Sequence, residues 1–293
     1  MDFTAQDLVY YLSAAAGAMS QDHMQHGIYL VYEEDGELIE KLWTGSEIKD
    51  QVLIAENRLV FCVDAQDFLR CHEYNPDDEE WSEVVLNGGQ AEEHGILIPP
   101  NSKLSGCFTS KGGQILFFQS SSGDLQGIVI EDNSKWEYLQ DPIPAKPLDG
   151  TPHSVIATST DQNIGLFYLS RVDNRMHHLF TEGTAEWHDT ILQAPEINDS
   201  VANFVVIPRD DGRFETILLV TDKIVRIDAE GLKIDMGNVV DGQFVPTSSK
   251  ECIIESISLV KKGIEAVASS KVAGPQKDKS KDKNEKDKKD GTK

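Results

Sequence analysis

The sequence lacks the features of a metal-binding or membrane-spanning protein. It has only four cysteines in 293 residues, and no two of them have the CxxC spacing of a structural zinc site. They are Cys62, Cys71, Cys107 and Cys252. We therefore expect free thiols and no metal centre. No apolar run approaches the roughly eighteen residues that a bilayer requires, so no transmembrane helix is expected.

Recognisable catalytic motifs are also missing. There is no nucleophile elbow, no glycine-rich phosphate loop and no HExxH zinc motif. Among the histidines only His177, His178 and His188 cluster, and strand alternation would point the first two to opposite faces. The fifty acidic residues give so many chance carboxylate pairs that a glycosidase is not indicated by counting. We expect a protein that is not an enzyme and uses no cofactor.

A basic surface is absent from the body of the chain. The net charge is −23, and the residues before Lys271 alone carry −27. Such a body repels nucleic acid and anionic membranes, so neither is expected as a partner. The N-terminus has Asp2 and Asp7 where a secretory signal would have basic residues, so we expect a cytoplasmic location.

The last 23 residues differ from the rest in composition. From Lys271 the chain holds nine lysines and five acidic residues, interleaved and almost without apolar side chains. Such a segment cannot offset the entropy of ordering by burial. The sequence predicts a disordered tail over 271–293 after a folded domain over 1–270.

What the sequence does contain is a repeat of short apolar strands. Six of them recur, after the first interval, at about fifty residues. They begin at Gly27, Arg58, Gln114, Ile164, Glu215 and Gly263. Each follows another short strand, and five are joined to a third by a tight polar link, such as "SSSGD" or "RVDNR". Four antiparallel strands at this spacing are typical of a β-propeller blade.

We therefore predict an all-β fold, a β-propeller of about six four-stranded blades, five complete and the last incomplete. The first strand of the first blade is assigned to "LVYYLSAA", residues 8–15. The incomplete blade is assigned to "ECIIESISLVKKGIEAVASS", residues 251–270. Its apolar residues also fit a helical stripe, but a hairpin is favoured because it repeats the first two strands of the other blades.

Three of the predicted blades share a tryptophan that opens the fourth strand. Trp81, Trp136 and Trp187 each follow a polar, turn-like run and precede a short apolar segment. Two interpretations are open. The rings either pack between neighbouring blades, or they form platforms on which a ligand stacks.

The order strand, short link, strand, turn and tryptophan resembles the fungal fucose-specific lectins, a family of six-bladed propellers. The segments "GIYLVYEEDGELIEKLW" and "QILFFQSSSGDLQGIVI" match its blades best, and the resemblance covers about residues 5 to 270. It implies a sugar held between neighbouring blades. One blade would supply an Arg on its second strand and a Glu on its third, and the next blade would supply stacking aromatics.

The aligned blades keep this constellation only in part. The Arg and Glu positions hold Ile28 and Glu40, Arg58 and Arg70, Ile115 and Gly127, and Gly165 and His177 in the first four blades. The ligand-binding residues that the resemblance implies are Glu40, Trp43, Arg58, Tyr74, Trp81, Trp136, Phe180 and Trp187. The best-preserved pocket combines Glu40 with Tyr74 and Trp81. The next combines Arg58 with Trp136, and a third joins Trp43 to the last blade.

Two functions follow from this partial match. One is a non-catalytic carbohydrate-binding propeller of weak or altered glycan specificity, with fucose or a related sugar held by aromatic stacking. The other is an interaction scaffold that kept the lectin fold, lost sugar binding and docks a protein partner.

Overall fold

A computed structural model describes most of the chain. The described residues are 4–14, 16–19, 28–34, 37–43, 48–49, 59–75, 80–88, 95–108, 114–131, 135–139, 142–157, 164–181, 186–192, 195–209 and 211–270. No helix among them is long and apolar enough to cross a membrane. The predicted tail at 271–293 lies outside these residues, as does the segment "DQVLIA" at 50–55, which the repeat predicts as the first strand of the second blade.

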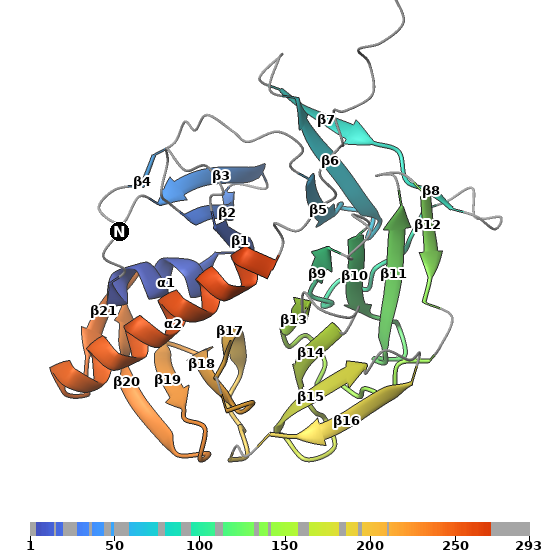
Figure 1. Ribbon diagram of the computed structural model, residues 1–293. Coiled ribbons are helices and arrows are strands. Elements are labelled where there is room, and N and C mark those ends of the chain that lie inside the picture. The colour runs from blue at the N-terminus through green and yellow to red at the C-terminus, as the bar shows by residue number, and fades with distance from the viewer. Residues whose placement is uncertain are drawn as a thin grey trace, which may run out of the picture.

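The strands form five sheets that follow one another around a common axis (Figure 1). The first contains β1 (Ala16–Met19), β2 (Ile28–Glu34), β3 (Glu37–Trp43) and β4 (Ile48–Lys49), and the second contains β5 (Leu59–Val63), β6 (Leu69–Asn75) and β7 (Glu80–Val84). The third contains β9 (Ser105–Phe108), β10 (Gln114–Gln119), β11 (Leu125–Glu131) and β12 (Lys135–Tyr138), with β8 (Asn87–Gly88) parallel to β12. The fourth contains β13 (His153–Ala157), β14 (Ile164–Leu169), β15 (Met176–Thr181) and β16 (Trp187–Ile191). The fifth contains β17 (Val201–Pro208), β18 (Phe214–Val220), β19 (Lys223–Ile227), β20 (Lys233–Val240) and β21 (Gln243–Pro246).

The blade repeat is confirmed by these sheets. Four of them have four or five strands, and the second has three described strands. The short polar links turn where the sequence predicted, because residues there adopt the left-handed backbone conformation. Asn174 has φ of 55° and Thr221 has φ of 53°, and Gly123 supplies φ of 77° in "SSSGD".

The first strand predicted at 8–15 is wrong. Residues 8–13 of this segment belong to helix α1 (Ala5–Ser13), and the first blade begins instead at β1. The Thr4 hydroxyl caps the helix by accepting a hydrogen bond from the backbone N–H of Asp7, and the Thr4 backbone N–H donates in turn to the Asp7 carboxylate. Leu8, Val9 and Leu12 then lie on one buried face, a helical spacing that an apolar run of this length also allows.

The incomplete sixth blade predicted at 251–270 is also wrong. These residues form helix α2 (Lys250–Ser270). The helical spacing of the apolar residues in this segment was therefore the correct interpretation, and the hairpin was not. Both helices lie between the first and fifth sheets (Figure 1), and α2 contacts β17, β1 and β13. The described residues therefore show no sixth blade, and a helix pair stands beside the fifth.

The core is divided among the interfaces between neighbouring blades. One apolar cluster lies between the second and third sheets, one between the third and fourth, and one between the fourth and fifth. A further cluster joins the fifth sheet to α1 and α2. The third, fourth and fifth sheets thus bury side chains on both faces, as stacking around an axis requires.

Candidate functional site

The second sheet brings two of the predicted ligand residues together. Tyr74 on β6 and Trp81 on β7 are direct cross-strand partners. The Trp81 side chain is 38% exposed. Glu40 and Trp43 lie on β3 of the first sheet, where the structure describes the backbone, with Glu40 opposite Val31. Arg58 lies outside the described residues.

The other two repeated tryptophans are packed between blades. Trp136 is only 6% exposed and lies in the cluster between the second and third sheets. It meets Tyr138 edge to face, with ring centroids 5.2 Å apart. Trp187 packs against the next cluster and meets Phe117 edge to face at 6.3 Å. The structure thus shows the packing interpretation for these two rings, and their ligand role stays a prediction.

Phe180 and Trp187 do not form one pocket, because they lie on opposite faces of the fourth sheet. Phe180 is paired across β15 and β16 with His188, whereas Trp187 is paired with Thr181. Phe180 instead lies between two imidazoles, 4.9 Å from His178 and 5.5 Å from His188 between ring centroids. Sequence reasoning missed both histidines as its neighbours.

The structure explains why the Arg and Glu pair is absent from the third blade. A Cβ atom on Gly127 would lie 2.4 Å from Leu139 Cδ1 and 3.1 Å from Phe117 Cε1, so a glutamate does not fit there without a shift. Ile115, at the Arg position, is buried in the adjoining cluster. Both positions have become part of the apolar packing.

Arg70 stands at the Glu position of the second blade and is held by two acids. Its Nη2 lies 2.7 Å from Asp64 Oδ2 and its Nη1 lies 3.2 Å from Glu83 Oε1. Hydrogen bonds from the Phe68 backbone and from Arg70 keep the pKa of the Asp64 carboxyl below its ordinary value. The pair is partly exposed, so water screens the attraction and the pair adds little to the stability of the blade edge.

His177, at the Glu position of the fourth blade, is held by two carboxylates. Its Nδ1 lies 3.1 Å from Asp189 and its Nε2 lies 3.2 Å from Asp173. The Tyr168 hydroxyl donates to Asp189 at 2.9 Å, and burial, followed by this bond, raises the pKa of Tyr168 above its ordinary value. Among the described residues, no group of three His, Cys, Asp or Glu side chains is arranged to hold a metal ion.

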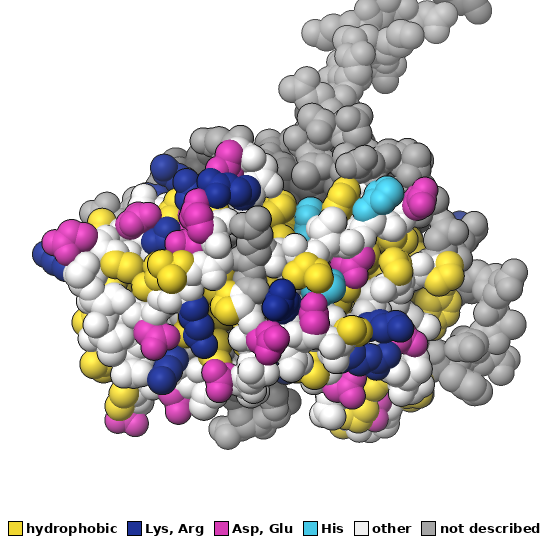
Figure 2. All heavy atoms as spheres, turned by 90° about the horizontal axis from the view of Figure 1, so that it is seen from below, with side chains coloured by type: hydrophobic (Ala, Val, Ile, Leu, Met, Phe, Trp, Pro, Cys, Tyr) yellow, Lys and Arg dark blue, Asp and Glu magenta, His cyan; other side chains and the backbone are white. Residues whose placement is uncertain are grey.

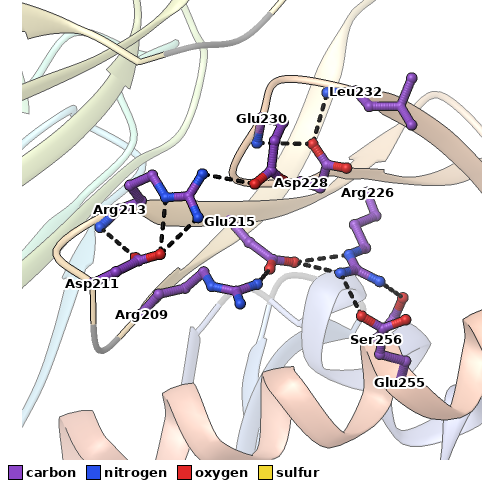
Figure 3. Close-up of polar contacts among 10 residues, drawn as sticks. All are labelled: Arg209, Asp211, Arg213, Glu215, Arg226, Asp228, Glu230, Leu232, Glu255 and Ser256. Atoms are coloured by element: carbon purple, nitrogen blue, oxygen red, sulfur yellow. Dashed lines mark hydrogen bonds and ion pairs between the residues drawn. The ribbon is translucent and has the colours of Figure 1, made fainter.

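A buried Arg and Glu pair was missed in the fifth blade (Figure 3). Glu215 on β18 is 1% exposed and accepts from Arg226 Nε on β19 at 2.8 Å. Arg226 also donates to Ser256 at 3.1 Å and to Glu255 at 3.0 Å, both on α2. Arg209 forms a further ion pair with Glu215. The only signal was a charged residue inside each of two mostly apolar strands, Glu215 in "FETILLV" and Arg226 in "KIVRI".

Comparison with solved structures finds lectins of this architecture. AofleA from Arthrobotrys oligospora matches with a TM-score of 0.56 and 14% identity, over 78% of this chain and 73% of its own. A variant of Aleuria aurantia lectin in complex with alpha-methyl-L-fucoside matches with a TM-score of 0.56 and 12% identity, over 78% and 80%. SapL1 lectin in complex with alpha methyl fucoside has a TM-score of 0.50 and 14% identity, over 80% and 85%.

Comparison by sequence gives no relative. No model of a protein family matches the chain, and no curated protein matches it either. The structural likeness therefore concerns the fold. The chain has the propeller fold of fucose-specific lectins, which confirms the resemblance at the level of architecture.

Proposed function

We propose that this protein is a non-catalytic, carbohydrate-binding propeller of weak or altered glycan specificity, which holds its ligand by aromatic stacking. The observation that carries the proposal is the pairing of Tyr74 with Trp81 on the second blade, where the indole is 38% exposed. Two residues that the resemblance to the lectins implied as ligand residues thus lie opposite one another in a fold shared with lectins solved with fucosides.

The chemistry of this pair suits a sugar. An exposed indole offers a flat apolar face, and the C–H face of a pyranose covers such a surface while its hydroxyls stay available for hydrogen bonds. In the proposed pocket Glu40, on the neighbouring first blade, accepts hydrogen bonds from those hydroxyls. With a single charged anchor, most sugar hydroxyls remain bound to water, so we expect binding in the millimolar rather than the micromolar range.

A scaffold that binds a protein is the second candidate, and the substituted Arg and Glu positions favour it. Gly127 is closed by packing, and Arg70 and His177 are already held by acidic partners. In these blades the polar groups that would recognise a sugar are therefore used within the protein. In this alternative the outer faces of the blades dock a protein instead.

Calorimetric titration of the full chain with methyl α-L-fucoside tests the proposal. We expect Trp81→Ala to weaken binding by roughly ten-fold, because it removes the stacking face. Tyr138→Ala is the matched control, since Tyr138 is an exposed ring, 46% accessible, on the outer strand of the next blade. A folded protein that binds no monosaccharide, or a Trp81 variant that binds as well as the wild type, would contradict the proposal.

A further inference from the structure

The outer edge of the fourth blade differs from the outer edges of the blades on either side of it. In the third sheet β8 lies parallel to the outer strand β12 and covers its edge. In the fifth sheet β21 covers β20, and Gln6 of α1 accepts a hydrogen bond from the Phe244 backbone on β21 at 2.9 Å. Among the residues that the structure describes, β16 of the fourth sheet pairs with β15 alone, and it lies on the outside of the ring (Figure 1).

The backbone of β16 presents hydrogen-bonding groups to the outside. The Leu192 N–H donates to the Met176 carbonyl at 2.9 Å, at the end of the ladder that joins β16 to β15. In an antiparallel pair every second residue is bonded in this way, so the N–H and C=O groups of Trp187, Asp189 and Ile191 point away from β15. Four of the five residues of β16 are exposed. This row of donors and acceptors has the geometry with which an added strand pairs.

Side-chain contacts hold β16 in its extended conformation. Trp187 packs into the apolar cluster between the third and fourth sheets. The Asp189 carboxylate accepts from the Tyr168 hydroxyl at 2.9 Å and lies 3.1 Å from His177 Nδ1, while its side chain stays 29% exposed. A strand that is already ordered loses little entropy when a peptide pairs with it.

Charge argues against a second copy of this chain as the occupant of the edge. Two β16 strands that paired antiparallel about Asp189 would place the two Asp189 carboxylates directly opposite one another, and like charges in that position destabilise a sheet. Each chain also carries a net charge of −23, so two chains repel one another.

The same charge attracts a basic occupant. Residues 176–208 contain five acidic residues and no lysine or arginine, and Arg175, just before them, pairs with Glu196. Ile191 is 53% exposed and offers an apolar contact beside Asp189 on the same strand face. Figure 2 views the fourth and fifth blades from outside the ring, and both acidic and hydrophobic side chains are exposed there. A matching strand has a basic and an apolar side chain two positions apart.

We propose that the outer edge of β16 is a docking site for an extended basic segment of a partner protein, which adds a fifth strand to the fourth blade. The backbone of the segment bonds to the outward groups of Trp187, Asp189 and Ile191. Its basic side chains lie beside Asp189 and its apolar ones beside Ile191. The site uses a strand edge and not a sugar pocket, so it is independent of the proposed carbohydrate binding.

Titration of the ¹⁵N-labelled full chain with synthetic peptides, followed by NMR and calorimetry, tests the site. The probe is the capped peptide "VTKTVTKTV", and the controls are the acidic "VTETVTETV" and "VTKPVPKTV", whose prolines remove backbone donors. Ile191→Pro removes one outward N–H and keeps the ladder to β15. Thr190→Lys and Thr190→Glu change the charge of an exposed position on β16 in opposite directions. Glu137→Lys is the control on the outer strand of the third blade, whose edge β8 covers.

The basic peptide should shift the amide signals of Trp187, Asp189 and Ile191 and slow their hydrogen exchange. Ile191→Pro should weaken its binding roughly ten-fold, because one backbone hydrogen bond is lost. Thr190→Lys should weaken binding and Thr190→Glu strengthen it, each roughly three-fold, and Glu137→Lys should leave it unchanged.

Several results would overturn the proposal. They are no binding at millimolar peptide, equal binding of either control peptide, Thr190 variants and an Ile191 variant that all bind as the wild type does, and amide changes confined to other blades. Dimerisation of the wild type in analytical ultracentrifugation, with the β16 amides protected, would assign the edge to a second copy instead. None of these results bears on the titration with methyl α-L-fucoside, so the proposed function stands or fails separately.

Discussion

At the scale of single residues, the three repeated tryptophans have different surroundings despite similar local sequences. Trp136 is buried against the second blade, Trp187 packs on the third, and Trp81 is more than one-third exposed. Local sequence sets the strand position of each ring. Its burial depends on side chains that the neighbouring blade supplies from some fifty residues away, and no local pattern encodes these.

The first prediction compares two of these tryptophans. Trp136→Ala should lower the free energy of unfolding by about 3–5 kcal/mol, because it removes a large buried ring and leaves a cavity between blades. Trp81→Ala should cost less than about 1 kcal/mol, since its ring is already partly in water. Urea titration followed by circular dichroism measures both, and equal losses would contradict the two environments.

At the scale of elements, the strands were predictable and the helices were not. Alternation, β-branched residues and turn-forming links set β10, β14 and β18 close to their observed bounds. The segments at 8–15 and 251–270 are apolar runs in which strand and helix periods both fit. Only the capping pair Thr4 and Asp7 and the i, i+4 spacing of Leu8 and Leu12 distinguish the first as a helix.

The fifth blade is joined to α2 by the buried Arg226, and this gives the second prediction. Arg226→Met should lower the free energy of unfolding by about 3 kcal/mol, because Glu215 loses a buried partner and Ser256 a donor. Arg209 keeps one ion pair with Glu215 and limits the loss.

The control for this change is Arg213→Met in the same blade. Arg213 pairs with Asp211 and Glu230, but all three side chains are 44–64% exposed, so the loss of stability should be much smaller than in the Arg226 variant. Amide exchange measured on α2 should rise in the Arg226 variant and stay unchanged in the Arg213 variant. The reverse order would contradict a role of Arg226 in docking the helix.

At the scale of the whole molecule, helix α1 near the N-terminus is bonded to the fifth sheet. Gln6 of α1 donates to the Gly242 carbonyl at 2.8 Å and accepts from the Phe244 backbone at 2.9 Å. The repeat made the propeller predictable, because strands that recur at a regular spacing indicate repeated structural units. Its completion by helices was not predictable, because the contacts that settle it join residues more than 230 positions apart.

The buried His153 and the half-buried His178 make the stability of the molecule depend on pH, which is the third prediction. Burial lowers the pKa of His153 and of His178 to about 4, below the ordinary value of 6.5. Between these values the unfolded chain binds protons that the folded chain does not. The free energy of unfolding therefore has its full value above about pH 6.5 and falls as the pH decreases toward 4.

Between pH 7 and pH 5 we expect the free energy of unfolding to fall by about 1–2 kcal/mol because of His153. The partly exposed His178 should contribute less. Urea unfolding at both pH values measures the loss, and His153→Gln should remove most of its share. An unfolding free energy that is the same at pH 5 and pH 7 would contradict the burial of these rings.

Carbohydrate binding is the function that we propose for this propeller. Screening the labelled full chain on a glycan array tests it most directly, because the array presents many sugars at high local density and so detects weak sites through avidity. We expect selective retention on neutral glycans, including fucosylated ones. We expect no retention on sialylated glycans that lack fucose. A folded chain that is retained on no glycan would contradict carbohydrate binding and would favour the protein-binding scaffold.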